Sequence, residues 1–132
     1  MRKIVTHQYR LLNAQLLPLL AAREILLVRA EELTAKQRRW VTKTFSREIF
    51  PVLTPIAVDP AHPFPTVANK GLHFIVELCL TQGGVASRVV IVKVSRGLPR
   101  LIEMHAGEAA HQRAYILLST LIECEMGRLF PG

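Results

Sequence analysis

The chain has 132 residues, half of them hydrophobic and 20% charged, with a formal net charge of +7. The length allows one domain with a sizeable core, and the composition excludes an intrinsically disordered chain, which combines low hydrophobicity with high net charge. Within residues 1–50, ten lysines and arginines face only four glutamates. This basic half suggests a polyanionic partner, and charge alone does not choose among nucleic acid, anionic lipid, nucleotide and polyphosphate. The alternative is that the charge serves only solubility or complements missing parts of a longer chain.

The first predicted element is a helix over residues 4–22. Apolar residues recur there at spacings of three and four, which indicates a helix face; they include Tyr9, Leu12, Leu16, Leu19 and Leu20. We expect Pro18 to kink this helix or to begin its last turn. Its most apolar part, residues 11–22, is shorter than the ~20 residues that a bilayer requires. We therefore predict no transmembrane segment.

A short strand is predicted over residues 24–29, followed by a second helix that begins near Thr34. Thr34 and Gln37 have the spacing of a capping box, in which each side chain binds the backbone N–H of the other residue. An apolar stripe with a spacing of four, formed by Val41, Phe45 and Ile49, predicts the buried face. Pro51 should end the helix.

The opposite face of this second helix is predicted to be basic, and Arg38 departs from the pattern by falling on the apolar side. Four cations share the basic face: Lys36, Arg39, Lys43 and Arg47. They could line the path of a phosphate polymer, with Lys and Arg as donors. The alternative is an ordinary solvated helix surface.

Five prolines interrupt residues 51–65. Because proline lacks an N–H and has a fixed φ, we expect neither helix nor regular strand there. The segment should instead lie extended with its apolar side chains inward, namely Val52, Leu53, Ile56, Val58 and Phe64. Asp59 is interpreted as a turn-forming residue.

The remaining chain predicts strands and a last helix. Residues 72–80 alternate in polarity, residues 87–94 are apolar on both faces, and Gly83-Gly84 between them predicts an antiparallel hairpin. A third strand is expected over residues 98–105. The last helix should begin at a Ser119 or Thr120 cap, with Leu118, Ile122, Met126 and Leu129 as its stripe. The predicted fold class is α+β, with helices packed on a small, mostly antiparallel sheet.

No pattern of residues predicts a catalytic or metal site. The histidines at positions 7, 62, 73, 105 and 111 form no metal-binding spacing, and Gly83-Gly84 lacks the rest of a P-loop. We expect each histidine to be hydrogen-bonded or to face solvent. Cys79 and Cys124 lie in apolar runs and are expected to be buried free thiols in a reducing compartment.

Residues 47–65, REIFPVLTPIAVDPAHPFP, and residues 68–78, ANKGLHFIVEL, closely resemble the head region of bacterial polyphosphate kinase. The resemblance continues through residues 91–94, 98–102 and 115–132. A structural role is expected for the residues of the signature, which are Asp59, Pro60, His62, Pro63, Phe64, Pro65, Asn69 and Lys70. Upstream, residues 16–20 and 33–40 resemble the junction of this head with an amino-terminal helical domain.

The resemblance implies that residues 1–23 form the last helix of the amino-terminal helical domain, and residues 24–132 part of the head, or middle, domain. Enzymes of this family transfer the terminal phosphate of ATP reversibly to inorganic polyphosphate, through a phosphohistidine and with magnesium. Their catalytic histidines lie in carboxy-terminal domains. None of the five histidines here inherits that role, so we expect a non-catalytic fragment without ATP or magnesium of its own.

The implied partners are the other domains of the parent enzyme, a second copy of the chain and inorganic polyphosphate, but no specific nucleic acid. The expected location is the cytoplasm, with any membrane association arising through the parent enzyme. Two alternatives stay open: a stand-alone basic module that binds polyanions, and a purely structural dimerisation unit.

Overall fold

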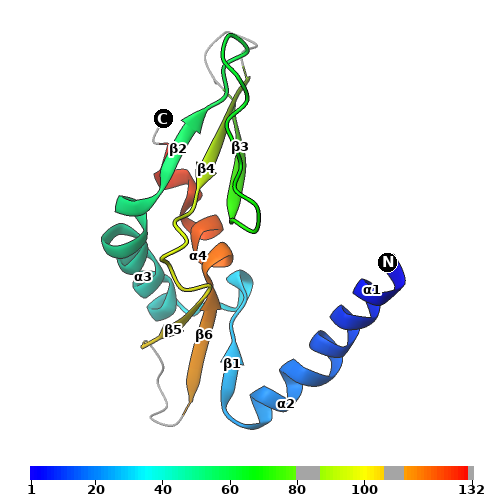
Figure 1. Cartoon of the computed structure of the whole chain (residues 1–132). Coiled ribbons are helices and arrows are strands. Elements are labelled where there is room, and N and C mark those ends of the chain that lie inside the picture. Colours follow the sequence, from blue (N-terminus) through cyan, green and yellow to red (C-terminus); the bar gives the residue numbers. More distant parts are fainter. Residues whose placement is uncertain (80–86, 106–111, 131–132) are drawn as a thin grey trace. The chain divides into compact units, whose positions relative to one another are not determined.

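The computed structural model describes residues 1–79, 87–105 and 112–130. The chain divides into two compact units, the first formed by Met1–Phe45 with Arg100–Gly132 and the second by Ser46–Pro99. Each unit contains one three-stranded sheet (Figure 1). The predicted α+β class is confirmed, although the strands form two small sheets where one was expected.

The first unit begins with an interrupted helix. Its segments are α1 (Arg2–Leu11), a π turn (Leu12–Leu16) and α2 (Leu17–Ala22), with Pro18 in the first turn of α2, as predicted. At its end the Arg23 N–H donates to the Leu20 carbonyl (2.9 Å) and Glu24 adopts a left-handed φ of 61°. This helix has no fully buried residue. Most of its large apolar side chains are exposed, namely Ile4, Val5, Tyr9, Leu12, Leu16, Leu19 and Leu20.

The sheet of the first unit joins distant parts of the sequence. Its strands are β1 (Ile25–Leu27), β5 (Leu101–Met104) and β6 (Arg113–Leu117), in the order β1-β6-β5. β1 runs parallel to β6, and β5 runs antiparallel to it. The strands expected over residues 24–29 and 98–105 are therefore confirmed, whereas β6 was not predicted.

Helix α4 (Leu118–Glu125) follows β6 without a loop. The prediction of a Ser119 or Thr120 cap is wrong, because the helix starts at Leu118 and Leu117 holds the cap position with no side-chain hydrogen bond. The Leu118 N–H instead donates to the Arg100 carbonyl (2.9 Å). A backbone acceptor thus satisfies one of the first four N–H donors of the helix, which have no partner within it.

Helix α3 (Ala35–Thr44) has the predicted capping box. The Gln37 N–H donates to Thr34 Oγ1 (3.2 Å), and the Thr34 N–H donates to Gln37 Oε1 (2.9 Å). The predicted apolar stripe is buried as well, with Val41, Phe45 and Ile49 each 1% exposed. Short turns flank the helix, at Ala30–Glu32 before it and at Phe45–Ile49 (a π turn) and Phe50–Val52 after it.

The second unit holds an antiparallel sheet. Its strands are β2 (Thr54–Ala57), β3 (His73–Cys79) and β4 (Ser87–Lys93), in the order β2-β4-β3. The pairing of β3 with β4 and the interior position of β4 are as predicted. The expected Gly83-Gly84 turn lies outside the described residues.

Strand β2 corrects the expectation that the proline-rich segment forms no regular strand. It lies at a sheet edge, where one side of its backbone needs no partner, and such edges tolerate a proline such as Pro55. The expectation of inward side chains is correct for Leu53, which is buried. It is wrong for Val52 and Phe64, which are 44% and 66% exposed.

Burial along β3 alternates as predicted: Phe74, Val76 and Leu78 are half-buried, and Ile75 is 75% exposed. The prediction of buried thiols is wrong, because both cysteines are exposed. Cys79 lies on the outward face of β3, and Cys124 lies on α4. The neighbours of Cys124 nonetheless desolvate its thiol enough to raise its pKa. No helix within the described ranges is long and apolar enough to cross a membrane.

Candidate functional site

Helix α3 displays cations on one face. Lys36, Arg39 and Lys43 are exposed at spacings of three and four, which place side chains on the same side of a helix. Arg47, the fourth predicted cation, is exposed too, but it lies in the Phe45–Ile49 π turn and belongs to the second unit. A π turn closes i→i+5 hydrogen bonds, so a regular helical step does not give the direction of Arg47.

The four cations have no acidic partner within the residues that the structure describes. The ion pairs found there join His62 to Asp59 and Arg128 to Glu125. Arg38, which was expected on the apolar side, is exposed and donates to the Ala30 carbonyl (3.3 Å). Uncompensated like charges attract anions to a surface, so the α3 cations can hold an extended polyanion.

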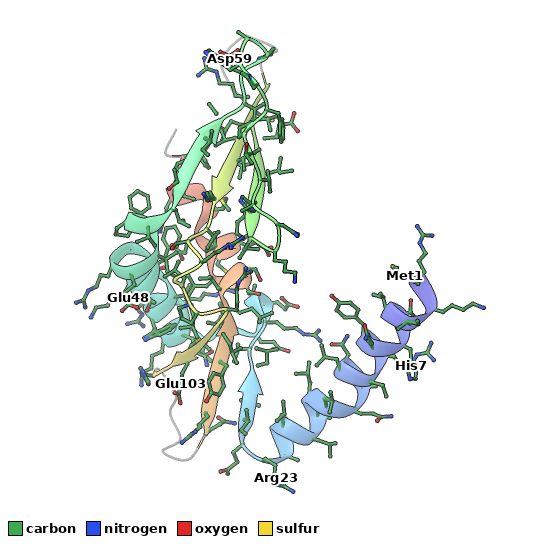
Figure 2. All side chains as sticks on the ribbon, viewed as in Figure 1. Met1, His7, Arg23, Glu48, Asp59 and Glu103 are labelled. Carbon is green, nitrogen blue, oxygen red and sulfur yellow. The ribbon has the colours of Figure 1, made fainter. Side chains whose placement is uncertain are left out.

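The predicted turn at Asp59 is present (Figure 2). Asp59 Oδ1 accepts the Ala61 N–H (2.9 Å), and Oδ2 lies 3.1 Å from His62 Nδ1. The backbone hydrogen bond from Ala61, and then the bond from His62, hold the pKa of Asp59 below its usual value. All of these contacts join neighbouring residues at the surface. Asp59 and His62 therefore stabilise a turn, and nothing in their contacts indicates catalysis.

The last two signature residues, Asn69 and Lys70, belong to a tight turn. The Gly71 N–H donates to the Ala68 carbonyl (3.1 Å), and Lys70 has a left-handed φ of 58°. Arg96 Nη2 donates to the Asn69 carbonyl (2.7 Å), which ties the turn to the residues after β4. This turn, the strands β2 and β3 and the end of β4 line an open cavity of about 670 Å³.

The cavity is lined in part by Thr54, His73, Lys93, Ser95 and Arg96. This cluster is not predicted by the sequence pattern. The sequence Lys93-Val94-Ser95-Arg96 at the end of a predicted strand does indicate a group of cations and a hydroxyl. Only the register of the sheet shows that His73 lies beside Lys93. The expectation that every histidine is hydrogen-bonded or faces solvent is wrong at His73, whose Nε2 is buried without a hydrogen-bond partner.

A resident metal ion has no visible protein ligands in this region. Across residues 1–79, 87–105 and 112–130, no three histidine, cysteine or acidic side chains come together in a metal-binding group. Carboxylates are also absent from the described lining of the cavity, and carboxylates are the usual protein ligands of magnesium. The chemistry offered by both basic regions is therefore anion binding.

Residues 36–132 match the model of the polyphosphate kinase middle domain. The chain is similar to a polyphosphate kinase of Neisseria gonorrhoeae, with 39% identity over 132 residues. It is also similar to one of Pseudomonas aeruginosa, with 42% identity over 129 residues. These alignments cover 99% and 97% of this chain but 19% of each relative. The chain therefore spans about a fifth of the length of these relatives.

The fold has a counterpart among solved structures. The crystal structure of the polyphosphate kinase from Porphyromonas gingivalis matches with a TM-score of 0.84 and 25% identity. The match covers all of this chain and 23% of that one. Because the middle-domain model and the alignments with relatives both extend over most of the sequence, the chain belongs to the polyphosphate kinase family.

Proposed function

We propose that this chain is the middle-domain part of an enzyme that transfers the terminal phosphate of ATP reversibly to inorganic polyphosphate, and that it contributes a basic surface to the path of the polymer. The family assignment supports the parent reaction. The exposed and uncompensated cations of α3, Lys36, Arg39 and Lys43, carry the specific role. In this proposal ATP, magnesium and the phosphorylated histidine belong to other parts of the parent enzyme.

The geometry favours a linear polymer over a compact ligand. Successive cations on α3 are three and four residues apart, about 4.5 and 6 Å along the axis at ~1.5 Å per residue. An extended chain of phosphates can contact several of them at once, and each contact releases condensed counterions. A small anion could contact only one or two.

Reversal of two charges tests this surface. Arg39→Glu combined with Lys43→Glu should weaken binding of long-chain polyphosphate by about tenfold or more at low salt, because each lost ion contact is worth roughly 1–2 kcal/mol. The slope of log affinity against log salt should also become shallower. Isothermal titration calorimetry at several salt concentrations measures both quantities.

The matched control is Arg88→Glu with Arg113→Glu, which makes the same change in net charge on β4 and β6. It should lower the affinity much less. Equal losses in the two variants would show that net charge alone attracts the polymer, and would contradict a path along α3. Single-stranded DNA should compete only as a poorer polyanion, since phosphate density and not base identity is recognised.

A second role, dimerisation, is favoured by the apolar face of α1 and α2. Tyr9, Leu16 and Leu19 are all more than half exposed, and apolar patches of this kind mark interaction surfaces. In the full enzyme, residues 1–23 are predicted to complete the amino-terminal helical domain, and that boundary stays a prediction. When the chain is isolated, we propose that this apolar face packs against a second copy of the same chain.

The isolated chain should therefore self-associate at tens of micromolar, as measured by light scattering coupled to size exclusion. Leu16→Glu with Leu19→Glu should yield a monomer, because two charges cannot be buried in an apolar interface without partners. Phe64→Glu with Val67→Glu, also at exposed apolar positions, should leave the association unchanged. A monomeric wild-type chain would contradict the dimerisation role and would leave the α3 proposal intact.

A further inference from the structure

The cavity of the second unit is built on one row of residues across its sheet. Thr54 of β2 and His73 of β3 both pair with Lys93 of β4, the central strand. Residues directly opposite in an antiparallel pair point to the same face, with Cβ atoms about 5 Å apart. A hydroxyl, an ammonium and an imidazole therefore stand side by side on one face of the sheet.

Two more donors come from the residues that follow β4. Arg96 uses Nη2 to bind the Asn69 carbonyl (2.7 Å), and a guanidinium has five N–H donors, so others are left for a ligand. Ser95 Oγ accepts the Gly97 N–H (3.2 Å), which leaves the hydroxyl hydrogen available. All the functional side chains described in this lining are hydroxyls, cations or imidazole, with no carboxylate to repel an anion.

His73 adds an observation that points to a missing ligand. Its Nε2 is screened from solvent and has no hydrogen-bond partner. The ring edge next to this nitrogen is confined, since a Cβ placed on Gly71 would lie 2.6 Å from His73 Cε1, the carbon bonded to Nε2. The ring therefore has little freedom to turn toward another partner, and buried polar groups without partners are uncommon in folded proteins.

We propose that this cavity, the His73–Lys93–Arg96 pocket, binds the oxyanion of a phosphate group. Lys93 and Arg96 supply charge, and His73 Nε2–H donates to an oxygen once the groups that now cover Nε2 move aside. Thr54 and Ser95 supply neutral hydrogen bonds. With no carboxylate for a metal ion in its described lining, the pocket binds phosphate and does not transfer it. It shares no residue with the α3 surface, and the proposal does not depend on that surface.

The phosphate could come from the polymer or from the triphosphate of a nucleotide, and the probes separate these sources. Tripolyphosphate, ATP and AMP are titrated into the purified 132-residue chain at low salt. Equal affinity for tripolyphosphate and ATP identifies the phosphate chain as the recognised group. An ATP affinity about tenfold higher identifies the nucleotide. If neither binds, the proposal is overturned.

The decisive variants act on the pocket. Lys93→Met, which keeps the apolar stem, should weaken tripolyphosphate binding by about tenfold, as expected for a charge-assisted hydrogen bond. Lys93→Ala with Arg96→Ala should abolish measurable binding. His73→Phe keeps a ring but removes the nitrogen, so it should weaken binding by about fivefold while leaving the unfolding midpoint unchanged or higher. If His73→Phe leaves the affinity for tripolyphosphate unchanged, His73 only packs in the structure, and its assignment as a hydrogen-bond donor to phosphate is overturned.

Two controls distinguish the pocket from general charge and from α3. Arg88 lies on the same strand as Lys93, five positions away, so it points to the opposite face of the sheet. Arg88→Ala with Arg113→Ala should change tripolyphosphate affinity by less than about twofold, and an equal loss would overturn the pocket. Arg39→Glu with Lys43→Glu should weaken binding of the long polymer but not of tripolyphosphate, so each proposal can fail while the other still holds.

A direct signal is available from the imidazole itself. On addition of tripolyphosphate, the ¹⁵N resonance of His73 Nε2 should shift, because an oxygen acceptor replaces an empty environment. The resonances of His62 and His105, which lie outside the lining, should move much less. A shift of equal size at all three histidines would indicate non-specific attraction and contradict the pocket.

Discussion

Supplied with ATP, magnesium and short polyphosphate, the purified 132-residue chain should add no measurable phosphate to the polymer. Phosphoryl transfer requires a nucleophile together with cations, usually including Mg²⁺, arranged around the transferred group. His73 lies among cations, but the described lining of its pocket offers no carboxylate for magnesium. Chain growth measured with radiolabelled ATP should therefore stay at background.

A full-length polyphosphate kinase assayed in the same buffer provides the positive control. A trace of a contaminating kinase would mimic activity, so the chain should also be assayed as its Lys93→Ala/Arg96→Ala variant. Turnover that survives further purification in the wild type and disappears in this variant would contradict the prediction. It would also make the pocket catalytic.

Phe45→Ala should destabilise the chain by about 3–5 kcal/mol, the range for truncating a buried phenylalanine. Phe45 is 1% exposed, where α3 passes into its π turn. A domain is stable by only about 5–15 kcal/mol, so this variant should lose a large part of its resistance to urea. The midpoint of urea unfolding, followed by circular dichroism, measures the loss.

Phe64→Ala is the matched control, since it removes the same ring from a position that is 66% exposed. Its effect should stay within about 0.5 kcal/mol, as is usual for surface substitutions. A large loss from Phe64→Ala would mean that its ring is covered in solution, for instance by self-association. Light scattering at the same concentration would show such an assembly.

The pattern of residues predicts the parts of this fold that local chemistry determines. The capping box at Thr34, the buried stripe through Val41 and Phe45, and the alternation along β3 all depend on neighbours a few residues away. Those parts are confirmed. The same reasoning missed β6, because its short apolar run passes directly into α4 and has no turn residues to separate strand from helix.

Pro55 explains why the expectation of no regular strand in residues 51–65 was wrong. Proline excludes a residue from the middle of a sheet but not from its edge, and only the strand order shows that β2 is an edge. Phe64 was expected inside because it is apolar. Apolar character alone does not bury a side chain, since more than half of a protein's surface is apolar.

The two basic regions differ in how far a sequence can reveal them. The cations of α3 repeat along one helix, so periodicity alone predicts their common face. His73, Lys93 and Thr54 come from three strands, and a shift of the register by one residue would move them to different faces. That pocket could be found only after the pairing of β2, β3 and β4 was known.

The parallel pairing of β1 with β6 has a consequence for biosynthesis. Residues 25–27 leave the ribosome long before their partners, residues 113–115, at roughly 5–20 residues per second. During that interval of several seconds the edge of β1 has no native neighbour. The inserted segment Ser46–Pro99 forms its own sheet and can fold before β6 is available to pair with β1. Its early folding would shorten the effective loop that β1 and β6 must close, which lowers the entropic cost of that closure.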